Sequence, residues 1–335
     1  MNNESKQPPK STHQVRRALI LLVVTLAISA FLILYGQRGV DIVLSRLYQP
    51  SPQIADINAR LAMTHLGTDL FYASAPKIED KTQFNASCET EERTIAILGC
   101  YFRRHIYLFD VKNKELDGTL EVTAAHEMLH AAYERLNFFE RTRVNSLIEA
   151  EYATLQDSPS LKQVMAYYAK SEPGEEINEL HSLLGTTVVH LSPELEAYYS
   201  QYFKDRASVV ALNAKYNAVF DSLRKKSDEL QKQLVALRAP LESDLDQYES
   251  DREQIELDIA SFNERAKTNG FPSQSSFTVA RNSLIMRVET MNTRQADINQ
   301  RVKDFNTIVE QINALAVRAN ELSSSINGAT TTKGL

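Results

Sequence analysis

The chain has few of the residues that define several large protein classes. It has no tryptophan and only two cysteines, Cys88 and Cys100, in 335 residues, too few for a disulfide-rich scaffold or a four-cysteine zinc module. Ten glycines and ten prolines exclude collagen-like and proline-rich fibres. Basic residues are not in excess, since 37 Lys and Arg stand against 43 Asp and Glu, which argues against a nucleic-acid partner. A hydrophobic content of 43% is still enough to bury a core, and the length suits about two domains.

Residues 18–35 form an uncharged run of eighteen residues. As a helix this run would be about 27 Å long, close to the hydrocarbon thickness of a bilayer. It predicts a membrane-anchoring transmembrane helix. A cleaved signal peptide is the alternative, although its apolar region is normally shorter. Residues 1–17 carry four basic residues against Glu4, so the positive-inside rule predicts that this tail is cytoplasmic and that everything after residue 35 is extracytoplasmic. The terminal position of the tail and its Pro8-Pro9 pair predict that it is disordered.

The two cysteines lie close together in the part of the chain expected outside the membrane. Cys88 and Cys100 are twelve positions apart, and disulfides persist in oxidising compartments. We therefore expect a Cys88–Cys100 disulfide, with two unrelated buried thiols as the alternative.

The segment 36–205 has a mixed pattern that is typical of an α+β domain. Thr68–Ala75 and Thr94–Tyr101 are rich in β-branched and aromatic residues, and Arg103–Val111 partly alternates, so each predicts a strand. A turn at Asp117-Gly118 precedes a predicted helix that continues through Leu136.

From residue 206 to 326, apolar residues recur every seven positions in a charged background, as in a coiled coil. One series is Phe220, Ser227, Leu234, Leu241, Tyr248, Ile255 and Phe262, and the other is Phe277, Leu284, Met291, Ile298, Phe305, Ile312 and Ala319. Both span 42 positions, and the Asn269–Ser273 segment between them stops one helix and starts another. This predicts an antiparallel coiled-coil hairpin, with separate packing of the two arms on the preceding domain as the alternative. Residues 327–335 predict a disordered tail.

The string His126-Glu127-Met128-Leu129-His130 is the clearest chemical signal. Residues four apart share one face of a helix, so both imidazoles can reach one metal ion. Glu127 can instead hold a zinc-bound water, whose lowered pKa lets the carboxylate take its proton during attack on a carbonyl. The neighbouring residues are uncharged, as a buried metal-bearing helix requires.

This string resembles the motif of the HExxH zinc metallopeptidases. The metzincin branch requires Gly and His where this chain has Tyr133 and Leu136. The gluzincin branch takes its third ligand, a Glu, from a later helix, and Asn178-Glu179 resembles that motif. The resemblance implies Zn²⁺ held by His126, His130 and Glu179, with Glu176 and Glu175 as alternatives to Glu179. Leu183 stands where thermolysin-like enzymes place an acid that orients the histidines, so this orientation must come from another residue.

The resemblance also implies that Arg103–Val111 is the edge strand that binds an extended peptide, with ordinary sheet pairing on both of its edges as the alternative. A group that stabilises the oxyanion is expected as well. Its candidates are His190, Tyr167, Tyr168, Tyr198 and Tyr199.

These observations predict a zincin-like α+β catalytic domain with an N-terminal transmembrane helix and a C-terminal coiled-coil hairpin. The expected function is membrane-anchored zinc metallopeptidase activity on a peptide or protein substrate, of which cell-wall stem peptides are one example. The alternative is an envelope structural or interaction protein, in which the hairpin binds a partner and the zinc domain is inactive.

Overall fold

The computed structural model describes residues 12–88, 98–171 and 173–326. Two compact units are present: unit 1 ends at Asn217 and takes in the final residues from Ser324, and unit 2 spans Ala218–Ser323. The predicted tail over 327–335 and most of the one over 1–17 lie outside the described residues. Residues 12–17, however, already belong to the first helix, so the tail prediction is wrong for them.

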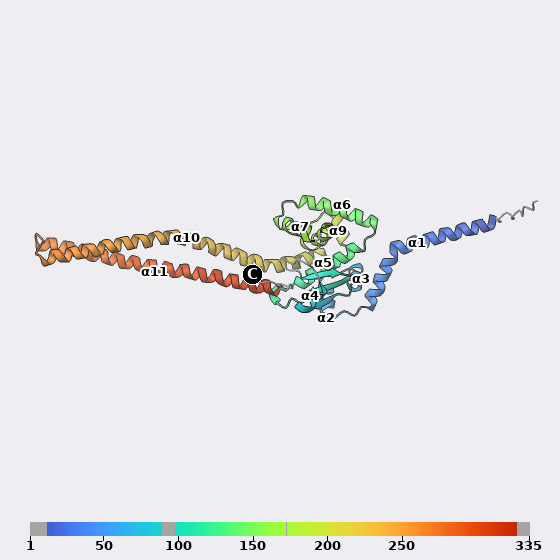
Figure 1. Cartoon of the computed structure of the whole chain (residues 1–335), viewed down its shortest axis with the longest axis horizontal. Coiled ribbons are helices and arrows are strands. Elements are labelled where there is room, and N and C mark those ends of the chain that lie inside the picture. The colour runs from blue at the N-terminus through green and yellow to red at the C-terminus, as the bar shows by residue number, and fades with distance from the viewer. Residues whose placement is uncertain (1–11, 89–97, 172, 327–335) are drawn as a thin grey trace, which may run out of the picture. The chain divides into compact units, whose positions relative to one another are not determined.

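In the residues that the structure describes, unit 1 is mainly helical, with one small sheet (Figure 1). Its helices are α1 (Thr12–Leu47), α2 (Pro52–Arg60), α3 (His65–Ala73), α4 (Lys81–Ser87), the short 3₁₀ helix η1 (Lys114–Leu116), α5 (Thr119–Glu134), α6 (Phe138–Thr154), α7 (Pro159–Ser171), α8 (Glu176–Thr187), α9 (Pro193–Tyr199) and the start of α10 (Arg206–Lys267). The prediction of an α+β fold is therefore wrong in its balance of helix and strand. The segment 68–75 illustrates why: Thr64 caps α3 by accepting a hydrogen bond from the Gly67 amide, and α3 buries Leu70 and Phe71.

The sheet has three short strands in the order β1-β3-β2. β3 (His105–Phe109) lies in the middle, parallel to β1 (Lys77–Glu79) and antiparallel to β2 (Gly99–Phe102). Arg103 and Arg104 join β2 to β3 with φ values of 49° and 66°, as a two-residue hairpin turn requires. The prediction that Arg103–Val111 is an edge strand is wrong, because β3 is paired on both sides.

Helix α1 does not end where the apolar run ends. It continues through residues 36–47, and there Asp41 and Ser45 are buried. Asp41 accepts hydrogen bonds of 2.9 and 3.0 Å from Arg135 Nε, and Ser45 donates to Asp69 on α3. Among the residues that the structure describes, no helix combines the length and apolarity needed to cross a membrane. The prediction of a transmembrane helix over 18–35 is therefore wrong, and so is the predicted membrane location that depended on it.

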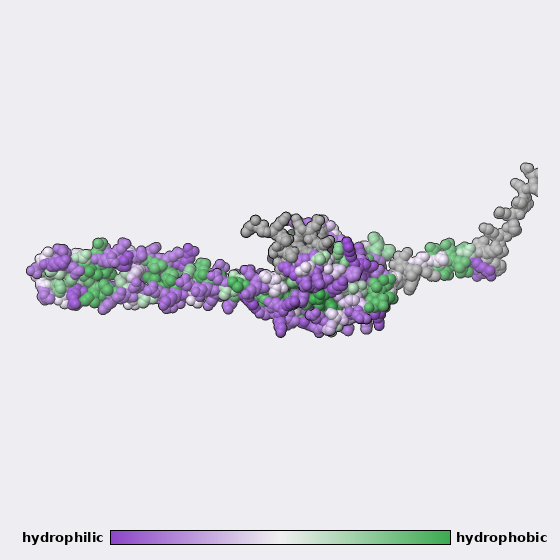
Figure 2. All heavy atoms as spheres, turned by 60° about the horizontal axis from the view of Figure 1, so that its bottom comes forward, coloured by the Kyte–Doolittle hydropathy of each residue, from purple (hydrophilic) through white to green (hydrophobic). Residues whose placement is uncertain are grey.

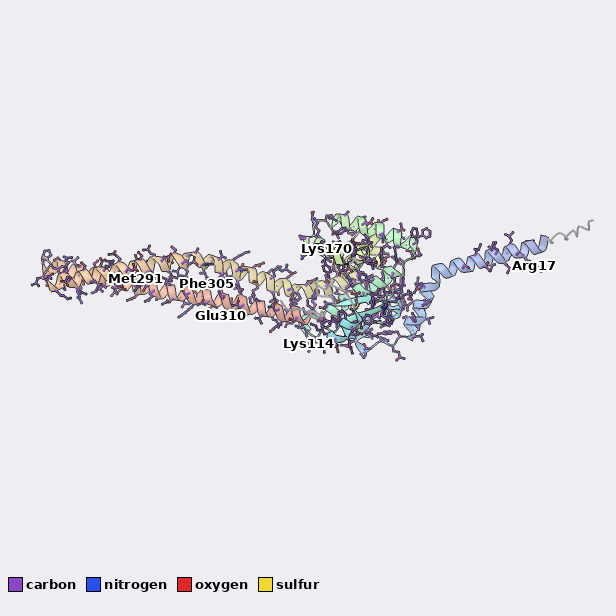
Figure 3. All side chains as sticks on the ribbon, in the orientation of Figure 1. Arg17, Lys114, Lys170, Met291, Phe305 and Glu310 are labelled. Carbon is purple, nitrogen blue, oxygen red and sulfur yellow. A yellow bond between two sulfur atoms is a disulfide. The ribbon has the colours of Figure 1, made fainter. Side chains whose placement is uncertain are left out.

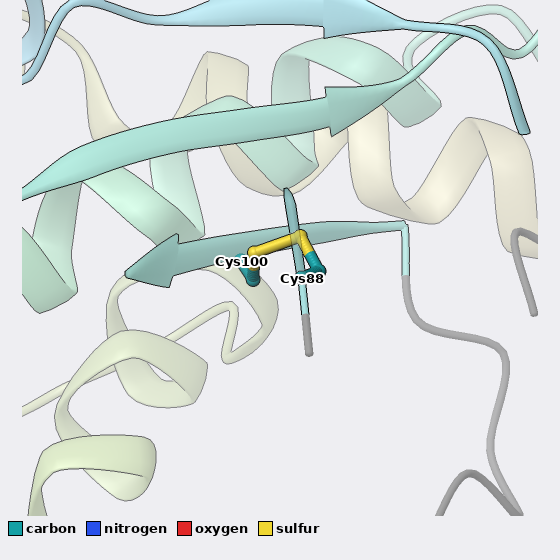
Figure 4. Close-up of a disulfide and its surroundings, with 2 residues drawn as sticks. All are labelled: Cys88 and Cys100. Atoms are coloured by element: carbon teal, nitrogen blue, oxygen red, sulfur yellow. A yellow bond between two sulfur atoms is a disulfide. The ribbon is translucent and has the colours of Figure 1, made fainter. Parts of the chain in front are cut away.

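The predicted disulfide is confirmed. Cys88, at the end of α4, is bonded to Cys100 on β2 (Figure 4). Phe84 and Phe109 pack around the bond in a small apolar cluster. The disulfide thus ties the outer strand β2 to the helix that precedes it in the chain.

Unit 2 is a hairpin of two long helices, most of α10 and of α11 (Gln274–Ser325) (Figure 1). The two heptad series meet in layers. Leu241 and Ile298 are both buried, and the rings of Phe262 and Phe277 lie 5.3 Å apart beside the turn. Met291 and Phe305, labelled in Figure 3, are α11 members of the same series.

A ladder of ion pairs runs between the two hairpin helices. Three aspartates of α10 pair with three arginines of α11. The pairs are Asp244–Arg301, Asp251–Arg294 and Asp258–Arg287. Each aspartate and each arginine stands three positions after a core residue of its own series. Sequence reasoning missed this regular charge pattern, although the seven-residue spacing of both sets makes it readable from the sequence alone.

Candidate metal centre

Helix α5 carries the HExxH residues through the middle of unit 1. Its small residues Ala124, Ala125, Ala131 and Ala132 are buried together with Met128 and Leu129, so neighbouring elements approach the helix closely. Gly118, with φ of 99°, stands at its N-cap position, in the turn predicted at Asp117-Gly118. A left-handed backbone at this point favours glycine.

Helix α8 lies directly against α5, and Gly185 permits the close approach. A Cβ at Gly185 would lie 2.4 Å from Leu129 Cδ1 of α5 and 2.8 Å from Tyr199 Cε1. Gly185 lies inside α8, which continues to Thr187. Glycine is needed here for space rather than as a stop signal, and the result is that the first turn of α8 faces the two histidines.

Three side chains from α5 and α8 converge on one point. His126 Nε2 and His130 Nε2 lie 3.1 Å apart, His126 Nε2 lies 3.1 Å from Glu179 Oε1, and His130 Nε2 lies 3.3 Å from Glu179 Oε2. The side chain of Glu179 is only 5% exposed, and its Oε1 accepts no hydrogen bond despite its burial. A buried carboxylate oxygen without a hydrogen bond of good geometry requires an explanation, and a bound cation would provide one. His126, His130 and Glu179 thus form a candidate site for a metal ion.

Without a metal ion, the charges of His126, His130 and Glu179 favour a proton bound at the point where a cation would lie. Burial alone would lower the pKa of His130, but the hydrogen bond and charge of Glu179 outweigh it and raise this pKa to about 9. Burial alone would raise the pKa of Glu179, but the charges of His126 and His130 hold it well below its usual range. A positive charge among these three groups is therefore strongly stabilised.

Asn178 supplies the orienting contact that Leu183 cannot make. Its Oδ1 lies 3.0 Å from His130 Nδ1, and because an amide oxygen only accepts, the Nδ1–H donates and leaves Nε2 to face the cluster. The Asn178 amide in turn donates to Glu175 Oε2 over 3.0 Å. Sequence reasoning cited Asn178 only as part of the ligand motif and missed this role.

Glu127 is buried one residue after the first histidine. It is 6% exposed, and its charge is among the groups that raise the pKa of His130. A Cβ at Gly99 of β2 would meet Glu127 Oε1 at 2.8 Å. The carboxylate is therefore packed closely against the outer strand of the sheet.

The other acidic candidates for the third ligand are used elsewhere. Glu175 accepts the hydrogen bond from Asn178, and Glu176 Oε2 accepts from the Gly174 amide over 2.8 Å. Of the three glutamates, only Glu179 enters the cluster with His126 and His130.

None of the five candidates for oxyanion stabilisation belongs to the cluster of His126, His130 and Glu179. The Tyr198 hydroxyl is 2.9 Å from Nε2 of the buried His181, and the Tyr199 hydroxyl donates to the His181 carbonyl over 2.6 Å. Burial, with the nearby charges of His130 and His126, lowers the pKa of His181 to about 3, so it stays neutral in this aromatic cluster. His190 is exposed on the segment after α8. Tyr167 and Tyr168 are on α7 with their rings 5.4 Å apart.

Comparison with protein families, with curated proteins and with solved structures found no match for this chain.

Proposed function

We propose that the chain is a zinc-dependent peptidase of the HExxH…E kind, with the ion held by His126, His130 and Glu179. The observation that supports this best is the convergence of two imidazole nitrogens and a buried carboxylate within 3.3 Å of one another. Two neutral histidines and one carboxylate are a donor set that catalytic zinc sites use, with a fourth position left for water or substrate.

The spacing of the three donors is compatible with zinc. Tetrahedral zinc with bonds of about 2.0–2.1 Å separates its ligand atoms by about 3.3–3.4 Å. The corresponding separations here are 3.1, 3.1 and 3.3 Å. The side chains of His126 and His130 are 18% and 14% exposed, so solvent and substrate have access from the histidine side.

Glu127 is the residue assigned to proton transfer. A bound zinc ion supplies Lewis acidity, which lowers the pKa of water and polarises a carbonyl. Glu127 takes the proton of the attacking water and then passes it to the leaving amine. The burial of this carboxylate and the effect of its charge on the pKa of His130 suit that role.

The outer edge of β2 is the best place for an extended substrate. The Phe109 amide donates to the Leu98 carbonyl, so the antiparallel alternation directs the backbone groups of Gly99 and Tyr101 away from β3. Within the described residues no strand pairs with this edge, and Gly99 contacts Glu127. A peptide that added a strand here would carry its carbonyls past the general base.

Glu127→Gln tests the proposal most directly. This variant should keep about one zinc per chain and lose hydrolysis of a diverse peptide library, because the base is not a ligand. His130→Ala should lose both zinc binding and hydrolysis, and treatment of the wild type with a chelator should abolish cleavage. Wild-type turnover by Glu127→Gln would refute the assigned mechanism.

A second candidate function is partner binding through the hairpin. Leu257, Val279 and Met286 are 66%, 67% and 61% exposed, and Figure 2 shows apolar residues interspersed with hydrophilic ones along unit 2. Polar substitutions at these three positions would abolish partner binding but leave peptide hydrolysis unchanged. If the purified wild type bound zinc and cleaved no peptide, this second function would be favoured.

A further inference from the structure

Gly99 lies where β2 passes over α5, beside the carboxylate of Glu127. A Cβ built at Gly99 would lie 2.5 Å from Thr123 Cγ2, 2.8 Å from Glu127 Oε1 and 2.9 Å from Glu127 Cγ, whereas real Cβ contacts essentially never fall below 3.0 Å. The backbone at Gly99 does not have a positive φ, so glycine is not required for its conformation. The requirement is for space.

We infer that Gly99 is a positioning residue for Glu127: the Glu127 side chain, together with the Thr123 methyl group, occupies the volume that any side chain at position 99 would take. The catalytic consequence of this inference rests on the proposed peptidase function, whereas the steric coupling between the two residues does not. Any substitution at Gly99 must displace a neighbour.

The strand cannot easily be the part that moves. Cys100, the next residue, is held by its disulfide to Cys88 and is paired with Tyr107 of β3. A Cβ at position 99 would overlap the Thr123 methyl group as well as Glu127 Cγ and Oε1, so both side chains must shift, and the carboxylate is displaced with the rest of Glu127. General-base catalysis requires this carboxylate within hydrogen-bond reach of the proton that it takes.

The effect on catalysis follows from that displacement. A misplacement of about 1 Å at a reacting group can cost about 10²-fold in rate. In the full-length, zinc-loaded protein, Gly99→Ala should therefore lower kcat about 100-fold with KM little changed and with zinc stoichiometry as in the wild type. Loss of zinc together with activity would indicate general damage and would overturn the inference, as would a wild-type kcat.

Gly67→Ala is the matched control for a crowded glycine of unit 1. A Cβ at Gly67 would lie 2.4 Å from the Tyr202 carbonyl oxygen and 3.4 Å from Met63 Cβ, and none of its near neighbours belongs to the metal cluster. This variant should lower the melting temperature and retain wild-type kcat in the folded protein. An equal loss of kcat in Gly67→Ala would show that crowding anywhere in unit 1 has the same effect, and would overturn a special role for Gly99.

A thermal-unfolding cycle in metal-free protein tests the contact without any assay of hydrolysis. Gly99→Ala should lower the melting temperature in the wild type and much less in a Thr123→Ser/Glu127→Ala background, in which the colliding atoms are removed. If Gly99→Ala alone did not fold, recovery of folding in that background would support the inference, and failure to recover would refute it. An equal temperature shift in both backgrounds would also refute it. A wild type without peptidase activity would instead refute the proposed function, and this cycle would still decide the role of Gly99.

Discussion

Removal of the Asn178 amide should weaken zinc binding, although Asn178 is not itself a ligand. In Asn178→Ala, the His130 Nδ1–H loses the acceptor that lies 3.0 Å away. The imidazole is then free to rotate and to adopt the tautomer that places its proton on Nε2, where the metal must bind. Residues that orient metal-binding histidines typically contribute 10- to 100-fold in metal affinity. Because Asn178 is only half-buried, we expect the lower part of that range, about tenfold or about 1.4 kcal/mol.

Competition of the purified protein with a zinc chelator of known affinity measures this change. Asn178→Asp is the matched variant, since a carboxylate oxygen still accepts from Nδ1, and it should bind zinc at least as tightly as the wild type. Glu175→Gln should change affinity by less than about threefold, because its contact to Asn178 is exposed and one step further from the metal. If Asn178→Ala kept wild-type affinity, or Asn178→Asp lost as much as Asn178→Ala, the orienting role would be refuted.

Three further predictions concern protonation, the disulfide and the hairpin. Because the pKa of His130 in the metal-free site is raised to about 9, zinc must displace a proton at lower pH, and apparent affinity should rise by up to about tenfold per pH unit until pH 9; a flat profile from pH 6 to 9 would contradict this. The Cys88–Cys100 bond closes a short loop with a sequence separation of 12, so Cys100→Ser should lower the free energy of unfolding by about 3 kcal/mol in denaturant titrations, and an unchanged midpoint would contradict it. Asp251→Arg should lower the melting temperature by opposing Arg294, and Arg294→Asp in the same chain should restore it if the pair acts as described.

The part of the site that follows from local spacing could be predicted from the sequence. His126 and His130 share a helix face by periodicity alone, and Glu127 adjoins them for the same reason. The choice among Glu175, Glu176 and Glu179 depends on how α8 lies on α5. That placement is set by Gly185 against Leu129, a contact between segments far apart in the sequence that no local pattern encodes.

The errors in the predicted fold also have local causes. A short apolar run such as Thr68–Ala75 has composition compatible with either strand or helix, and the cap at Thr64 together with burial of one face decides for helix. The order of strands in the sheet depends on tertiary pairing, so the central place of β3 could not be read from Arg103–Val111 alone. The hairpin was predictable because its signal repeats over many heptads.

The ion-pair ladder of unit 2 restricts how the hairpin can change in length. If one arm slid past the other by seven residues, so that Asp251 faced Arg301, the apolar layers would still match, but Asp244 would lose its arginine and Arg287 would face Arg265. An insertion in α10 therefore has to be matched by an equal insertion in α11 at the same distance from the turn. Steps of seven residues, added to both arms together, preserve the layers and the charge pairing at once. Length variants that obey this rule should fold, and variants with an insertion in a single arm should form a bulge or lose the pairing beyond it.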